Sequence, residues 1–340
     1  MNKAALYTGN QNFEIKEVKP KVPGEGQVRI KVSHCGICGT DLHIFHGKMD
    51  ARVSIPQPIG HEMSGIITEI GDEVDGLTVG DRVVVRPLDW CGECPACKNG
   101  FTHICQKLKF LGIDTPGAFQ SHWSVPARVV HKIPDSIPMD IAALIEPLAV
   151  ACHDLRIAEA KSGEYAVVLG GGPIGMLIAM TARHQGLRVL LSEINPVRLA
   201  LAAEIGIDTI NPKEQDLVKT VWKNTGNAGA DIVFEATATQ AAASVMTELP
   251  RCRGRIVTVG IFSQPPQIDL FKFFWRELQL RGARVYEEAD YETAIEMAAQ
   301  NTLPLDKLIT RVYPLEQIQQ AFESLENNAN AMKVLVQCSK

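Results

Sequence analysis

A strand, a glycine-rich turn and a helix follow one another in the middle of the sequence. The apolar run Tyr165–Leu169 (YAVVL) leads directly into GGGPIG, and a predicted helix follows over Met176–His184. Glycines at the first, third and sixth positions permit a tight turn, close approach of a pyrophosphate to the backbone, and close packing of strand and helix. The pattern therefore predicts a Rossmann-type nucleotide loop formed by Gly170, Gly172, Pro173, Ile174 and Gly175.

An acidic residue ends the next predicted strand. Glu193 follows Arg188–Ser192 and lies about 18 residues after Gly175, where a carboxylate can bind ribose hydroxyls. A plain glycine-rich turn would need no such acid. Because a carboxylate repels a 2′-phosphate, the sequence favours NAD over NADP. Arg198 either stacks on the adenine or lies on the solvated face of a helix, and both interpretations stay open.

A change of pattern divides the chain into two domains, as expected for 340 residues. From Phe13 to about Val130, short alternating runs indicate mainly β structure, whereas strands and helices alternate regularly after Asp140. Candidate strands cover residues 165–169, 188–192, 232–235 and 255–259, with helices over 176–184 and 240–249. This repetition predicts a doubly wound parallel sheet.

The last part of the chain is expected to return to the first domain. It offers two further helices, over residues 291–299 and 316–326, and a last strand over 332–337. We therefore expect a first domain of residues 1–149 completed by 288–340, with a nucleotide-binding domain of residues 150–287 between these two segments.

Composition excludes several classes of protein. A hydrophobic fraction of 46%, a charged fraction of 21% and a net charge of -5 fit neither a nucleic-acid-binding nor a disordered chain. No run approaches about 18 apolar residues and no signal-peptide pattern opens the sequence, so we expect a cytoplasmic protein without membrane contact. Nine cysteines, four of them crowded together, favour metal binding in a reducing compartment over disulfides.

The crowded cysteines form the spacing C-x2-C-x2-C-x7-C. Four thiolates can close a tetrahedral shell around zinc without an open position, which is typical of a structural site. An iron–sulfur cluster is an alternative, although its fourth cysteine would usually follow at three residues and precede a proline. A zinc ribbon for nucleic acid is a third, but basic and aromatic residues do not alternate in the loop. The cysteines are Cys91, Cys94, Cys97 and Cys105.

Further candidate ligands lie upstream, in Cys38–His43 (CGTDLH) and in Gly60–Glu62 (GHE). Three protein ligands with one open position are typical of a catalytic zinc. Spacing alone does not assemble such a site, because these residues lie more than twenty positions apart. Individually, His61 could be a core histidine and Glu62 a surface acid. Cys35 forms a C-x2-C pair with Cys38 but is interpreted as a packing residue.

The segments GICGTDLH, GHE, CGECPAC, LIEPLAVACH and VLGGGPIG stand in an order that resembles the medium-chain zinc-dependent alcohol dehydrogenase family. The resemblance covers essentially the whole chain. It is greatest to the polyol (sorbitol), threonine and sugar-acid dehydrogenase branch, because Glu62 follows His61 directly and Glu146 lies in IEP. It implies an α/β protein with a GroES-like β-rich catalytic domain and a Rossmann domain.

The resemblance also implies roles for individual residues. Cys38, His61 and Glu62 would bind the catalytic zinc, and Glu146 would ligate it directly or hold its water, unless it only caps its own helical turn. Thr40 would pass the alcohol proton on, and His43 would release it to solvent. In relatives, the backbone at the positions of Val259, Gly260 and Ile261 binds the carboxamide of nicotinamide.

The expected activity is hydride transfer between NAD and a secondary alcohol, with two zinc ions per chain. Relatives active on sorbitol carry an arginine where this chain has Val285, so a polyol, sugar or sugar acid other than sorbitol is favoured. The alternatives are a zinc-free NADP-dependent quinone or enone reductase of the same fold, and a non-catalytic zinc-carrying binding protein. Relatives are usually homotetramers or dimers.

Overall fold

The computed structural model describes residues 2–339, which divide into two units. Unit 1 comprises residues 2–146, Glu287–Asn301 and 305–339, and unit 2 comprises Pro147–Tyr286 and Thr302–Pro304. The sequence placed the two changes of domain after residues 149 and 287. The unit boundaries lie after residues 146 and 286, and a short return to unit 2 occurs at residues 302–304.

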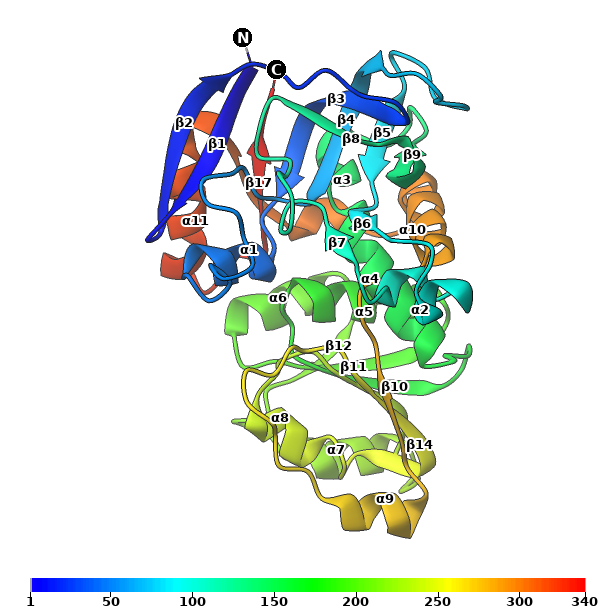
Figure 1. The fold of residues 1–340 in the computed structure, drawn as a ribbon. Helices are drawn as coiled ribbons and strands as arrows, with labels where there is room; N and C mark the ends of the chain where they lie inside the picture. The colour runs from blue at the N-terminus through cyan, green and yellow to red at the C-terminus, as the bar shows by residue number, and fades with distance from the viewer. Residues whose placement is uncertain (1, 340) are drawn as a thin grey trace. The chain divides into compact units, whose positions relative to one another are not determined.

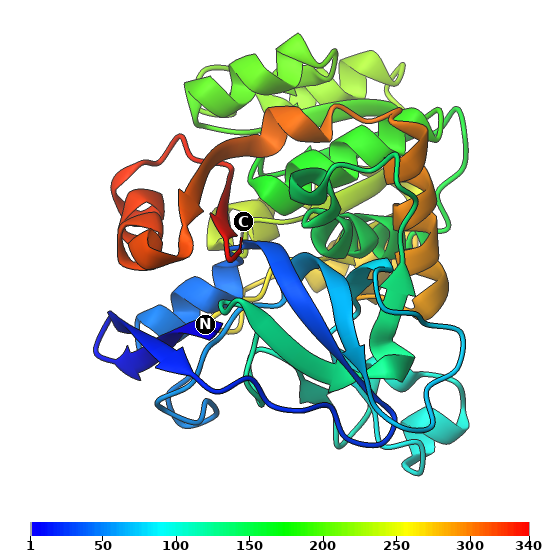
Figure 2. The ribbon, with the colours of Figure 1, turned by 90° about the horizontal axis from the view of Figure 1, so that it is seen from above.

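Unit 1 is built around a mixed β-sheet. Its strands lie in the order β16 (Ile309–Pro314), β17 (Lys333–Gln337), β3 (Gln27–Gly36), β4 (Glu62–Ile70), β5 (Arg82–Val85) and β9 (Val130–Lys132), and β8 (His122–Pro126) also pairs with β3. Strand β17 pairs antiparallel with β3 although unit 2 separates them in the sequence, and Figure 2 shows them side by side in red and blue. Burial alternates along β3 because one face packs on the core.

Smaller elements surround this sheet. The hairpin of β1 (Asn2–Gly9) and β2 (Asn12–Val18) is antiparallel, as is the pair of β6 (Leu88–Asp89) and β7 (Lys109–Phe110). The α-helices of unit 1 are α1 (Gly39–Phe45), α2 (Pro95–Lys98), α3 (Met139–Ala142), α10 (Glu288–Gln300) and α11 (Ile318–Asn327). Short 3-10 helices are η1 (Thr102–Ile104), η2 (Ala127–Val129), η3 (Leu305–Leu308) and η4 (Leu315–Gln317).

Unit 2 is a doubly wound parallel sheet. Its strands lie in the order β12 (Asp208–Ile210), β11 (Arg188–Ser192), β10 (Tyr165–Leu169), β13 (Ala230–Glu235), β14 (Pro250–Thr258) and β15 (Gln279–Gly282). Its helices are α5 (Pro173–His184), α6 (Pro196–Glu204), α7 (Leu217–Asn224), α8 (Gln240–Val245) and α9 (Leu270–Arg276), while α4 (Ile145–Ile157) begins in unit 1 and continues into unit 2. In Figure 1, α5 and α6 lie on one face of this sheet and α7, α8 and α9 on the other.

The interior of unit 2 explains why the glycine loop has a fixed position. Strand β10 is buried at every residue, as expected for a central parallel strand covered on both faces. Its side chains Val167 and Leu169 join a core cluster with Val233, Ile256 and Ala243. Proline at the first turn of α5 supports the helix start directly after the loop.

The predicted elements match the structure best where the sequence pattern is regular. Strands 165–169 and 188–192 coincide with β10 and β11. Strand β14 starts at Pro250 and not at Arg255, since Pro250 already pairs with Ala230 of β13 before an irregularity in the register. Helix α8 stops at Val245, four residues before the predicted end, since the chain turns there towards β14. Helices α6, α7 and α9 and the hairpin β1–β2 were not predicted.

Within residues 2–339, no helix combines the length and the apolar character needed to cross a membrane.

Candidate active site

Four cysteines gather around one point in unit 1. The sulfur atoms of Cys91, Cys94, Cys97 and Cys105 lie within 4.8 Å of one another. The Sγ atom of Cys105 is 3.5 Å from that of Cys91 and 3.8 Å from that of Cys94. Tetrahedral zinc with Zn–S bonds of about 2.3 Å requires sulfur atoms roughly 3.8 Å apart. The cluster therefore has the dimensions of a closed, structural zinc site.

The backbone around this cluster stabilises thiolates. The amides of Cys97 and Gln106 lower the pKa of the Cys94 thiol to about 6. The amide of Cys91 donates to the Sγ atom of Cys105 at 3.4 Å. Because the thiolate is the form that binds a metal, these N–H groups prepare the cluster for a cation.

A second group of ligand atoms forms where β3 and β4 meet. Cys38, His61 and Glu62 each place a ligand atom within 4.8 Å of the other two. Gly36 at the end of β3 pairs with Glu62 at the start of β4, so Cys38 lies two residues beyond this pair. A Cβ atom at Gly36 would lie 2.2 Å from Oε2 of Glu62, so glycine makes room for the carboxylate. Three ligands of these types fit an open zinc site.

Asp41 is a buried carboxylate that sequence reasoning missed. Its Oδ2 atom accepts a hydrogen bond from the amide of Cys38 at 2.9 Å, and its Oδ1 atom lies 3.6 Å from Nδ1 of His61. Burial raises the pKa of Asp41 to about 6, although the charge of His61 opposes this shift. A carboxylate behind Nδ1 orients a metal-binding imidazole. The signal was its position three residues after Cys38, where it caps helix α1.

Lys333 is a second functional residue that sequence reasoning missed. It is buried on β17, and its Nζ atom lies 2.5 Å from Oε1 of Glu62 and 3.3 Å from the carbonyl oxygen of Ile37. Burial alone would lower the pKa of Lys333, but the charges of Glu62 and Cys38 raise it. The carboxylate of Glu62 thus has an ammonium partner inside the protein. A lone lysine in the apolar run MKVLV was the available signal.

Glu146 lies close to the second group but outside it. It is buried in the first turn of α4 and does not belong to the set of three mutually close ligand atoms. Its charge still reaches His61. Burial lowers the pKa of His61, whereas the charges of Asp41, Cys38 and Glu146 raise it well above its ordinary value. Glu146 therefore adds negative charge near His61, which favours a bound cation.

Helix α1 carries both residues of the predicted proton relay. Thr40 and His43 are three positions apart, so they share a face of the helix. Thr40 is partly buried and His43 is exposed, an order that leads from the interior to solvent. Burial lowers the pKa of His43, so its ring is neutral near pH 7 and can accept a proton.

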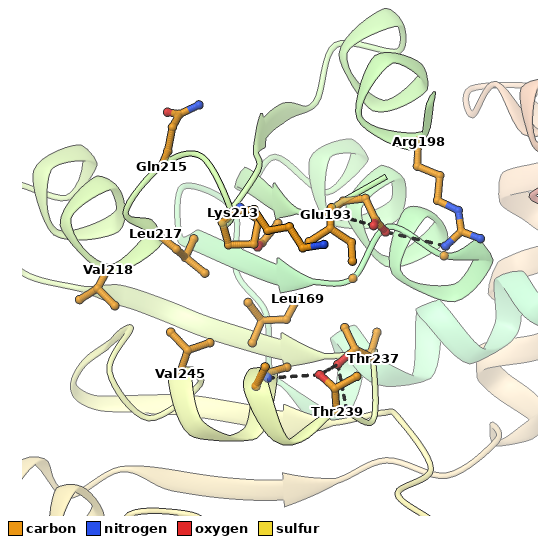
Figure 3. Close-up of a pocket in the computed structure, with 18 of the residues that line it drawn as sticks. Leu169, Glu193, Arg198, Lys213, Gln215, Leu217, Val218, Thr237, Thr239 and Val245 are labelled. Carbon is orange, nitrogen blue, oxygen red and sulfur yellow. Dashed lines mark hydrogen bonds and ion pairs between the residues drawn. The ribbon is translucent and has the colours of Figure 1, made fainter. Parts of the chain in front are cut away.

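Unit 2 contains a cavity of about 900 Å³ at the end of β10 (Figure 3). Gly170 and Gly172 line it together with Glu193, Arg198 and Thr237. Its volume lies in the range of cofactor sites, which are often at the carboxyl edge of such sheets. The residues that line the cavity therefore include Glu193 and Arg198, the acidic and the basic cofactor residue predicted from the sequence.

Glu193 is held firmly at this cavity. Its Oε2 atom accepts a hydrogen bond from the amide of Gly171 at 2.7 Å, and its Oε1 atom accepts from Ile194 at 2.6 Å and from Asn195 at 2.9 Å. The Nη1 atom of Arg198 lies 3.8 Å from Oε2 of Glu193, and a dashed line marks this pair in Figure 3. The carboxylate is thus fixed beside the glycine loop.

The remaining loop residues begin helix α5. Gly172 is the N-cap, and Pro173 and Ile174 occupy the first turn. A Cβ atom at Gly175 would lie 1.9 Å from the carbonyl oxygen of Gly170, so only glycine allows the helix to pack this closely. This is the packing role that the sequence pattern assigns to the last glycine.

The predicted nicotinamide contacts lie elsewhere in unit 2. Val259, Gly260 and Ile261 follow β14, and the amides of Val259 and Gly260 both donate to the carbonyl oxygen of Glu235 at 2.9 Å. Ile261 is 76% exposed. These three residues are not among those that line the cavity, so their role in binding nicotinamide stays a prediction.

Comparisons with known proteins agree on the class of this chain. The sequence matches the family "Alcohol dehydrogenase GroES-like domain" over residues 24–135 and the family "Zinc-binding dehydrogenase" over residues 173–300. It is 54% identical to the 2-dehydro-3-deoxy-L-galactonate 5-dehydrogenase of Pseudoalteromonas atlantica, over 99% of this chain and 98% of that protein. It is 33% identical to the sorbitol dehydrogenase of Halalkalibacterium halodurans, over 96% of each chain.

Solved structures support the same class. A zinc-binding dehydrogenase from Sinorhizobium meliloti 1021, bound to NADP, matches with a TM-score of 0.93 at 30% identity and covers 99% of each chain. The fold is therefore a GroES-like domain combined with a Rossmann domain. The chain is an oxidoreductase of alcohols in polyols and sugar acids, and zinc and a nicotinamide nucleotide are its cofactors. It belongs to the medium-chain zinc-dependent alcohol dehydrogenase family, in the polyol and sugar-acid branch.

Proposed function

We propose that this chain oxidises the C5 hydroxyl of a 2-dehydro-3-deoxy sugar acid, with NAD as the hydride acceptor. The observation that carries the proposal is the group of Cys38, His61 and Glu62 in a chain that matches a named sugar-acid 5-dehydrogenase almost end to end. Oxidation of a secondary alcohol at this carbon gives a ketone, so the product is a 2,5-dioxo-3-deoxy acid.

Different residues of the chain would bind zinc and transfer the proton. Cys38, His61 and Glu62 would hold zinc, which when bound supplies Lewis-acid chemistry that acidifies an alcohol hydroxyl. The proton of this hydroxyl leaves through Thr40 and then His43, whose neutral ring can accept it. Cys91, Cys94, Cys97 and Cys105 would hold a second zinc that fixes their loop.

In the nucleotide site, different residues would bind the pyrophosphate and the ribose. The glycine loop places the amides of Gly172 and Ile174 at the start of α5, where they would bind a pyrophosphate, whereas the amides of Gly170 and Gly171 donate to Ser192 and Glu193. Glu193 would accept hydrogen bonds from ribose hydroxyls, and its negative charge favours NAD over NADP. One solved relative is bound to NADP, so the fold alone does not decide between the two nucleotides, and the preference for NAD rests on Glu193.

The substrate assignment is tested by comparing substrates with the purified zinc-loaded protein. We expect 2-dehydro-3-deoxy-L-galactonate to give a higher kcat/KM with NAD than sorbitol, 2,3-butanediol or L-threonine, measured by the absorbance of the reduced nicotinamide. A higher kcat/KM for any of the three other alcohols would refute the substrate assignment. A higher kcat/KM with NADP than with NAD would refute the role of Glu193 alone.

We further propose that the protein is a homo-oligomer in which unit 2 pairs with a second copy. Strand β15 ends the sheet of unit 2, so its outer edge is open among the described strands. The adjoining helix α9 exposes Phe271, Phe274 and Trp275, which are 63%, 77% and 71% exposed. An open edge beside exposed aromatic side chains fits a two-fold contact. Light scattering should show a dimer or tetramer that Phe274→Glu weakens; a monomeric native protein would contradict this.

The thiols support a reducing compartment, and we propose the cytoplasm. Within residues 2–339, none of the nine cysteines is in a disulfide, including the buried Cys35 and Cys338. Four of them form the metal cluster, which oxidation would destroy. Fractionation of the native cells should place the enzyme with cytoplasmic markers.

A further inference from the structure

We infer that Arg52 binds the carboxylate of the sugar-acid substrate and so selects acidic over neutral alcohols, an inference that rests on the proposed function. Arg52 lies in the segment between α1 and β4, nine residues before His61. His61 forms, with Cys38 and Glu62, the set of candidate zinc ligands that we call the metal group. Its side chain is 43% exposed, so a ligand can reach the guanidinium from solvent.

The guanidinium of Arg52 has a fixed orientation. Its Nε atom lies 2.6 Å from Oδ1 of Asp114 and its Nη2 atom lies 2.7 Å from Oδ2, which makes a bidentate ion pair. Burial raises the pKa of Asp114, but the hydrogen bonds from Arg52 and from the amide of Phe110 lower it below its usual value. The pair is therefore fully ionised near neutral pH and positions Arg52.

Asp114 connects this pair to the metal group. Its Oδ2 atom also accepts a hydrogen bond from the amide of Phe110 at 2.7 Å. The ring of Phe110 contacts that of His61 edge-on, with the ring centres 5.2 Å apart. Arg52 is thus linked to His61 through two intervening residues.

Backbone contacts join the segment that carries Phe110 and Asp114 to the residue before His61. The amide of Ala118 donates to the carbonyl oxygen of Gly60 at 2.9 Å, directly before His61. A Cβ atom at Gly112 would lie 2.2 Å from the same carbonyl oxygen, and one at Gly117 would lie 2.4 Å from it. This close backbone packing keeps the segment that carries Asp114 beside the residues that precede His61.

Arginine in this arrangement still offers one binding edge. Asp114 binds the edge formed by Nε and Nη2, which leaves Nη1 and the second hydrogen of Nη2 for another acceptor. That outer edge matches the two oxygens of a carboxylate. Asp114 and the substrate would then bind adjacent edges of one guanidinium.

The proposed substrate has a carboxylate at a suitable place. Its carboxylate carbon C1 lies four bonds from the reacting C5, so an extended chain separates them by about 5 Å. A receptor for the carboxylate must therefore belong to the residues around the metal ligands, and Arg52 is joined to His61 through Asp114 and Phe110. Sorbitol and 2,3-butanediol have no carboxylate and gain nothing from such a receptor.

The test compares Arg52→Met with the native enzyme on an acidic and a neutral substrate. Loss of a hydrogen-bonded charge should raise KM for 2-dehydro-3-deoxy-L-galactonate about 10- to 100-fold. Its kcat should change little, and kcat/KM for 2,3-butanediol should stay within about twofold, because the neutral alcohol does not contact the guanidinium. Zinc content and the melting temperature are measured on each variant.

Two further variants separate charge from structure. Lys109→Met removes another cation beside Phe110, from an exposed site, and should leave KM for the acid unchanged. Asp114→Asn weakens the ion pair that orients Arg52 but keeps the charge of Arg52, so it should raise KM for the sugar acid less than Arg52→Met does. Equal losses on both substrates in Arg52→Met, or a KM increase of the same size in Lys109→Met, would overturn the inference.

The same assay separates this inference from the proposed function. If the native enzyme oxidises 2,3-butanediol but not the sugar acid, the proposed substrate is wrong and the role of Arg52 is overturned with it. If the native enzyme oxidises the sugar acid while Arg52→Met keeps the native KM for it, only the role of Arg52 is overturned.

Discussion

Replacing Lys333 by methionine would show how the buried carboxylate beside the metal group is stabilised. Methionine keeps the length and the apolar contacts of the side chain but removes the ammonium that lies 2.5 Å from Oε1 of Glu62. Both side chains are buried, with relative exposures of 4% for Lys333 and 0% for Glu62. Removing one partner of a buried ion pair costs about 3–5 kcal/mol. The metal-free variant should therefore melt about 10 °C lower than the metal-free native protein.

Zinc should reverse most of this loss. A bound divalent cation compensates the charge of Glu62 in place of Lys333, so the zinc-loaded variant should regain much of its melting temperature. Linkage then requires tighter zinc binding, about tenfold for each 1.4 kcal/mol recovered. The assay is calorimetric melting of protein with a loaded four-cysteine site, with and without zinc in the second group, together with zinc affinity from chelator competition.

A double variant gives the matched control. In Lys333→Met with Glu62→Gln neither charge is left, so the metal-free protein should recover most of the lost stability. An unchanged melting temperature in metal-free Lys333→Met would refute the reasoning. So would a loss of equal size with and without zinc, because the lysine would then not neutralise Glu62.

Three further changes test other parts of the molecule. Gly175→Ala places a Cβ atom 1.9 Å from the carbonyl oxygen of Gly170. It should therefore destabilise unit 2 by about 1–3 kcal/mol and weaken NAD binding. Unaltered NAD binding in a fluorescence titration would contradict the role of Gly175 in packing. Cys97→Ser should reduce zinc from two ions per chain to one in elemental analysis, since three thiolates no longer close the shell. Burial lowers the pKa of His131 to about 4, so acid favours the unfolded state between pH 6.5 and 4. His131→Gln should lessen that acid loss by up to about 3 kcal/mol, and identical melting curves against pH would exclude it.

Local sequence patterns predicted the features whose contacts are local. The four cysteines lie within one loop, so their spacing alone indicated the cluster that the structure brings within 4.8 Å. The glycine loop was equally clear, because strand, turn and helix are consecutive and Glu193 ends the neighbouring parallel strand. In both cases the chain has little freedom between the residues concerned.

Distant partners could not be predicted in the same way. The ion pair of Lys333 with Glu62 joins residues 271 positions apart, and that of Arg52 with Asp114 joins residues 62 positions apart. Such pairs depend on strand order and register, which a single sequence does not specify. Even Cys38, His61 and Glu62 were assembled from a family resemblance, because only the pairing of Gly36 with Glu62 places them together.

The position of β17 affects the order in which the protein can be completed during synthesis. This strand lies between β16 and β3 in the sheet of unit 1, yet its residues leave the ribosome after all of Pro147–Tyr286. Unit 2 can therefore fold while the edge of β3 that pairs with β17 is still unpaired. Lys333 arrives with the closing strand, so the nascent chain exposes Glu62 without its ammonium partner.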